Sequence, residues 1–78
     1  MIDIEYMEKK LANNELTDSE ISDIDSELME IVRDELTDEQ FNKWVMAWID
    51  IEEIIDKIQG WDTETQLETI KSLRKIIK

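Results

Sequence analysis

The sequence contains no cysteine, no histidine and no proline, and its single glycine is Gly60. Without cysteine the chain can form no disulfide, thiolate nucleophile or zinc–thiolate site. Without histidine it also lacks the side chain that most often serves as a general base or metal ligand near neutral pH. Most catalytic chemistry is thereby excluded, and we expect a protein that is not an enzyme and binds no cofactor or metal.

Long apolar runs are also missing. No stretch approaches the roughly 20 apolar residues that a bilayer-spanning helix needs. The first residues, Met1 to Tyr6, lack the basic start and the apolar segment of a signal peptide. We therefore expect a cytoplasmic protein.

The absence of proline and the near absence of glycine disfavour a turn-rich β architecture and favour helices. With 78 residues and a hydrophobic fraction of 41%, the chain can form one small core and fits one domain covering residues 1–78. Apolar residues recur at helical spacing in four segments. The predicted fold is all-α, a small compact bundle of three longer helices plus a short N-terminal helix, with helices at about 3–12, 18–34, 38–59 and 63–77.

Two helices have strong start signals. The Thr17 hydroxyl can accept from the amide of Glu20 while the Glu20 carboxylate reaches back to Thr17, and Thr37 repeats this arrangement with Gln40. A third such pair, Thr63 with Gln66, is expected after a left-handed stop at Gly60.

The predicted helix 38–59 is apolar over more than one stripe around Trp44 and Trp48. One explanation is a central helix that the other three cover. The other is contact with a second copy of the chain or another protein. The candidate self-association residues, which would make a homodimer, are Trp44, Val45, Met46 and Ile49.

Charge is concentrated in the first half of the chain. Residues 1–40 carry 14 acids against three bases, a net charge of −11, out of −12 for the whole sequence. A field of this sign repels nucleic acid and anionic lipid and attracts basic surfaces. The expected partner is a basic protein surface, including that of a nucleic-acid-binding protein, with no direct binding to nucleic acid or membrane.

Five acids in the predicted helix 18–34 are spaced three and four residues apart, which places them along one side of the helix. We expect this side to lie opposite the apolar stripe and to bind the partner. Like charges one turn apart cost about 0.2 to 0.5 kcal/mol per pair, so the arrangement destabilises the isolated helix. We call this set the acidic ridge: Glu20, Asp23, Glu27, Glu30 and Asp34.

One enzymatic pattern is present. Glu27-x-x-Glu30 followed by Glu53-x-x-Asp56 resembles the paired acidic motifs of MazG-type nucleotide pyrophosphohydrolases. The resemblance implies an all-helical fold in which the four carboxylates hold magnesium for attack on a nucleoside triphosphate. It covers only these four positions, and a chain this rich in acids produces such short matches by chance.

The preferred functional hypothesis is a non-enzymatic acidic module that binds protein. Small acidic proteins of phages and mobile elements often inhibit a nucleic-acid-handling protein by occupying its basic groove as a nucleic-acid mimic, and the composition here is similar. The main alternative is a self-association or adaptor module that uses the apolar surface of helix 38–59, with the acids serving solubility. The remote alternative is the MazG-like activity.

The capping boxes make a direct prediction about stability. Replacing Thr37 by alanine removes a helix cap and should lower the free energy of unfolding by about 1 kcal/mol. Urea unfolding followed by far-ultraviolet circular dichroism measures this loss and tests the helical fold in the same experiment. A spectrum dominated by strand or coil would contradict the fold, and an unchanged unfolding free energy would contradict the cap.

Overall fold

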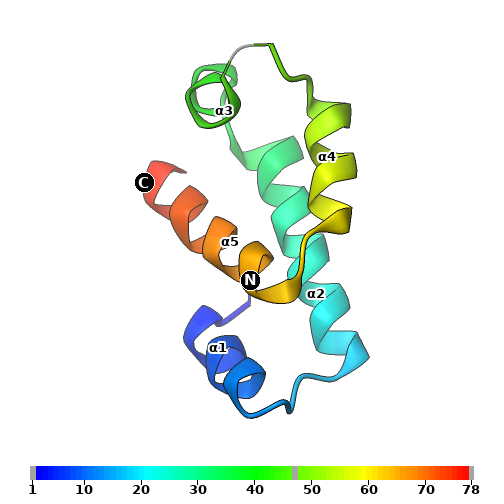
Figure 1. The fold of residues 1–78 in the computed structure, drawn as a ribbon. Helices are drawn as coiled ribbons and strands as arrows, with labels where there is room; N and C mark the ends of the chain where they lie inside the picture. Colours follow the sequence, from blue (N-terminus) through cyan, green and yellow to red (C-terminus); the bar gives the residue numbers. More distant parts are fainter. Residues whose placement is uncertain (1, 47, 78) are drawn as a thin grey trace.

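The computed structural model describes residues 2–46 and 48–77, and within these residues all regular structure is helical (Figure 1). This confirms the predicted all-α bundle with a short N-terminal helix. None of the helices in the described part of the chain has the length and apolarity that a membrane span requires. In chain order the elements are α1 (Ile4–Ala12), α2 (Asp18–Glu30), the π-helical segment η1 (Ile31–Glu35), α3 (Asp38–Val45), α4 (Ile51–Gly60) and α5 (Thr63–Ile77).

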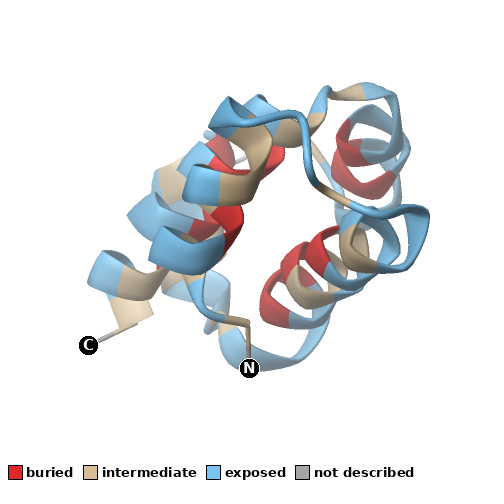
Figure 2. Cartoon of the chain, turned by 90° about the horizontal axis from the view of Figure 1, so that it is seen from below, coloured by how far each residue is buried: buried red, intermediate tan, exposed pale blue. Residues whose placement is uncertain are grey.

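Helices α2 and α5 pack most extensively against each other, and the other elements join this pair. Helix α1 lies against α5, while α4 lies along α2 and η1. Helix α3 sits at the opposite end of the bundle from α1 (Figure 1). The buried faces of the helices point inward (Figure 2) and form one core, to which every element contributes: Met7, Ile24, Leu28, Ile31, Val32, Val45, Ile54, Ile58, Leu67, Ile70 and Leu73.

Local signals at the helix starts are confirmed. The Thr17 and Thr37 hydroxyls accept from the amides three residues on, at 3.2 and 3.1 Å, and both reciprocal bonds are present. Helix α1 ends in a Schellman motif, in which Asn14 adopts a left-handed φ of 56° and the Glu15 amide donates to the Lys10 carbonyl at 2.8 Å.

The continuous helix predicted over residues 38–59 is wrong, because the structure has two helices, α3 and α4, with a break between them. On one straight helix Val45 would point roughly half a turn away from Ile54 and Ile58, so the two halves could not face one core. The break reorients the second half. Met46, at the break, has a φ of 61°, a strained backbone for a residue other than glycine.

The sequence contains a start signal for α4. Asp50 caps α4 by accepting from the Glu53 amide at 2.8 Å. Aspartate followed three residues later by glutamate, directly before apolar residues, is a helix-start pattern. It marks a new helix inside the segment that was predicted to be continuous.

The turn between α4 and α5 also differs from the prediction. Gly60 is the last residue of α4 and has no positive φ, so it does not act as a left-handed stop. Asp62, rather than Thr63, caps α5 by accepting from the Thr65 amide at 2.8 Å.

Gln66, predicted to belong to a capping box, is instead a buried polar side chain of the core. Its amide nitrogen donates to the Ile58 carbonyl at 2.8 Å and to the Asp25 carboxylate at 3.1 Å. The side chain therefore joins α5 to both α4 and α2, and it is a second donor to the Ile58 carbonyl, which also accepts from the Trp61 amide at 3.1 Å.

The backbone at Gly60 predicts that alanine there will stabilise the fold. A Cβ at this position meets nothing within 4 Å, and alanine reduces the freedom of the unfolded chain. Gly60→Ala should raise the free energy of unfolding by about 0.4 to 1 kcal/mol, measured by urea unfolding. Asn14→Ala provides the contrast, because alanine in the left-handed conformation should lower stability by about 1 kcal/mol. A loss of stability in Gly60→Ala would instead support a left-handed stop.

Candidate protein-binding surfaces

The structure divides the acidic ridge into two parts. Glu20 lies on the side of α2 that faces α1, where its carboxylate accepts from the Lys10 ammonium at 3.0 Å. The same carboxylate accepts from the Thr17 amide at 3.1 Å as part of the capping box. Glu20 therefore links α1 to the start of α2 and has a role within the fold.

Glu27 has a similar role near the N-terminus. Its carboxylate accepts from the Ile2 amide at 3.1 Å and lies 3.7 Å from the Arg74 guanidinium. Arg74 in turn donates to the Ile2 carbonyl at 3.0 Å. The backbone of Ile2 is thus held between α2 and α5, and Glu27 is mostly covered.

The prediction that the whole ridge lies opposite the apolar stripe is wrong. Each of three ridge acids directly precedes a buried residue: Asp23 precedes Ile24, Glu27 precedes Leu28 and Glu30 precedes Ile31. One residue is about 100° of helix rotation, so the ridge borders the stripe. Its inner edge therefore meets α1 and α5.

The remaining ridge residues, Asp23, Glu30 and Asp34, are exposed, and we call them the outer ridge acids. Within the described residues, ion pairs engage Glu8, Glu20, Glu27 and Glu39, and none engages an outer ridge acid. Asp25 is partly buried and bound by Gln66. Further acids on the same half of the chain are exposed and extend the negative field: Glu15, Asp18, Glu35, Asp38 and Glu39.

The predicted self-association residues are also divided. Val45 is only 7% exposed and belongs to the core, so its assignment to a contact surface is corrected. Trp44 and Ile49 are half-buried against the core. Met46 is 61% exposed, and Trp48 is 77% exposed. The break after α3 removes Trp48 from the helical stripe and leaves an apolar projection at the α3–α4 turn.

The MazG-like acids do not form a common site. Glu27 is engaged with Ile2 and Arg74, while Glu30, Glu53 and Asp56 are exposed. Among residues 2–46 and 48–77, no group of three or more acidic side chains is placed to hold a metal ion.

The electrostatics of the α1–α2 contact follow from its hydrogen bonds. Tyr6, whose ring centroid is 5.1 Å from the Lys10 ammonium, and then Glu20 raise the pKa of Lys10. The Thr17 amide and then Lys10 lower the pKa of Glu20 below 4.5. Both charged forms are therefore favoured in the folded state.

No protein-family model matches the chain, and neither the curated proteins nor the solved structures gave a match. No relative therefore supplies a substrate or a partner. The charge and exposure of the surfaces described above are what indicate a function.

The lowered pKa of Glu20 predicts how stability depends on pH. A carboxylate with a depressed folded-state pKa stabilises the fold above its unfolded pKa, 4.5, and loses this contribution as the pH falls through its folded pKa. Glu20→Gln keeps a capping side chain, as Gln40 shows at Thr37, but loses the ion pair with Lys10. It should therefore be less stable than the wild type at pH 7, and this difference should shrink below pH 4.5.

Urea unfolding at pH 7, 4 and 3 measures this difference. Glu30→Gln is the matched control, because its exposed side chain has no ion pair within the described residues. Its stability at pH 7 should be unchanged or higher, since a like-charge neighbour is removed. A Glu20→Gln variant as stable as the wild type at pH 7 would show that the ion pair does not support the fold.

Proposed function

We propose that this protein is a non-enzymatic acidic module that binds a basic surface of another protein through its outer ridge acids. The observation that supports the proposal is the division of the ridge. Glu20 and Glu27 are engaged within the fold, whereas Asp23, Glu30 and Asp34 are exposed without an ion pair in the described part of the chain.

Repulsion within the outer ridge supports a role in binding. Glu30 and Asp34 lie one turn apart, a spacing at which like charges destabilise a helix by about 0.2 to 0.5 kcal/mol. No ion pair among the described residues offsets this repulsion. A basic partner would offset it, and the field of the first half of the chain would steer that partner toward α2.

We propose the basic groove of a nucleic-acid-handling protein as the target class. The outer ridge acids alone place three charges over 12 residues, roughly 16 Å of helix, which is a far lower charge density than that of duplex DNA, about 1.7 Å per charge. The other exposed acids of residues 15–39 raise this density. In this mode the protein would act as an inhibitor, as small acidic proteins of phages and mobile elements do.

Self-association is the second candidate, and the exposure of Trp48 and Met46 favours it. Tryptophan is enriched among residues that dominate binding energy at protein interfaces. The net charge of −12 opposes pairing of two copies at low salt, so a dimer should strengthen as salt screens the repulsion. Binding to a basic partner has the opposite salt dependence.

The central test removes the outer ridge charges. D23N/E30Q/D34N should bind a basic partner at least about tenfold more weakly while remaining folded, because these side chains make no ion pair in the described structure. The immobilised protein is exposed to host extract, bound proteins are identified by mass spectrometry, and each is purified for affinity measurements. The expected partner has a nucleic-acid-binding groove, is displaced by duplex DNA, and dissociates as salt shortens the screening length from about 10 Å to 3 Å.

The matched control is E52Q/E53Q/D56N, which removes three exposed charges from α4 instead. It should retain the partner with nearly unchanged affinity. Equal weakening by both variants would show that only total charge matters. Full retention by D23N/E30Q/D34N, together with salt-strengthened dimers in light scattering, would favour self-association through Trp48 and Met46.

A further inference from the structure

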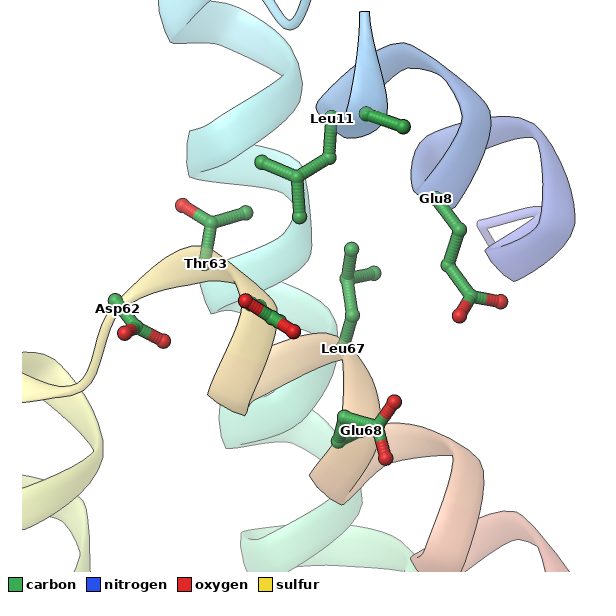
Figure 3. A pocket seen from close by; sticks show the side chains of 8 residues that line it. Glu8, Leu11, Asp62, Thr63, Leu67 and Glu68 are labelled. Carbon is green, nitrogen blue, oxygen red and sulfur yellow. The ribbon is translucent and has the colours of Figure 1, made fainter. Parts of the chain in front are cut away.

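A hollow of about 590 Å³ lies between α1 and the first turns of α5 (Figure 3). Its floor is apolar, since Leu11 from α1 and Leu67 from α5 point toward each other across it. Ala12, a small and exposed side chain, also lines it. The volume is within the range of sites that take a ligand, about 300 to 1,000 Å³.

The rim of this hollow is acidic. Glu8 from α1 and Glu64 and Glu68 from α5 line it, and both glutamates of α5 are exposed. Asp62 also lines it, but its carboxylate caps α5, and its hydrogen bonds with the side chain and then the amide of Thr65 lower its pKa. The residues that line the hollow include no lysine or arginine.

One cation pairs with the rim: the Lys71 ammonium lies 4.0 Å from Glu8. Both side chains are substantially exposed, at 53% and 39%, so this pair is weak and readily exchanged for another cation. The rim therefore already pairs with a lysine ammonium at one edge. Its other two glutamates have no ion pair within the described residues.

Resting on the proposed function, we infer that this hollow receives a lysine- or arginine-bearing amphipathic segment of the basic partner. Such side chains have an aliphatic stem and a charged head. The stems fit against Leu11 and Ala12, above the buried Leu67, and the heads reach the carboxylates of Glu64 and Glu68. A second copy of this chain is a poorer occupant, because its net charge of −12 repels the rim.

The test uses a short amphipathic peptide of leucine and lysine, with a matched peptide in which glutamine replaces lysine. Calorimetry measures affinity, and amide chemical shifts of the full chain locate the peptide. E64Q/E68Q should weaken binding of the lysine peptide about tenfold. E52Q/D56N is the matched control, because it neutralises two exposed acids with the same spacing at the start of α4, and it should bind nearly as the wild type does.

Two further variants separate shape from charge. Ala12→Phe places a bulky side chain at a lining position without changing net charge and should weaken binding at least about fivefold, with its melting temperature showing that the fold is kept. Lys71→Gln frees Glu8 and should tighten binding, whereas Lys57→Gln, which removes an exposed charge from α4, should have a smaller effect. Shift changes around Leu11 and Leu67 are expected for the lysine peptide alone.

Equal weakening by E64Q/E68Q and E52Q/D56N, or full binding by Ala12→Phe, would overturn the assignment of the hollow. Peptide binding lost only in D23N/E30Q/D34N would also overturn it, while leaving the proposed function in place. Absence of any peptide binding would overturn the assignment of the hollow as a binding site. The affinity measurements on the natural partner would still decide the role of the outer ridge acids. If E64Q/E68Q and Ala12→Phe weaken binding of the lysine peptide while D23N/E30Q/D34N still binds the natural partner, binding in the hollow is supported and binding through the outer ridge acids is rejected.

Discussion

The packing of α2 against α5 is the contact on which the rest of the structure depends. Ile24 and Leu28 of α2, and Ile70 and Leu73 of α5, are fully buried. Burial of such side chains stabilises a fold by about 1.5 to 3 kcal/mol each. Helices as short as α1, α3 and α4 are marginal in isolation, and they persist here because α1 packs on α5 and α4 packs on α2 and η1.

This packing also decides what each charge of α2 can do. Once Ile24 and Leu28 face α5, the acids beside them on one edge must meet α1 and the N-terminal segment. Glu20 and Glu27 are paired there with Lys10 and Arg74. The outer ridge acids lie on the other edge and contact solvent. The acidic ridge is thus divided into Glu20 and Glu27, which stabilise the fold, and the outer ridge acids, which carry surface charge. A variant that neutralised all five would lose the stabilising ion pairs and also relieve repulsion, two effects on stability of opposite sign.

Features encoded within a few residues could be predicted from the sequence, whereas features that depend on tertiary packing could not. The boxes at Thr17 and Thr37 and the all-helical class follow from local chemistry. The break after α3 required comparison of the directions of two apolar stripes, although Asp50 gave a usable start signal. The position of Gln66 was beyond such reasoning, because its partners, Asp25 and the Ile58 carbonyl, come from two other helices. The spacing of the five ridge acids could be predicted from the sequence. Which of them are engaged within the fold depends on where α1 packs, and this could not be predicted.

The hollow is another feature that depends on tertiary packing, and its acidic rim is connected to the acidic ridge through α1. Glu8 and Glu64 are far apart in the sequence and become neighbours only because α1 packs against α5. That packing is reinforced where Glu27 and Arg74 hold the backbone of Ile2, directly before α1. Glu27 therefore helps to shape the hollow although it does not line it. Loosening of α1 would separate Glu8 and Leu11 from Glu64 and Glu68 of α5 while leaving the outer ridge acids on α2 and η1 in place. The hollow therefore depends on the inner edge of the ridge, and the outer ridge acids do not depend on the hollow.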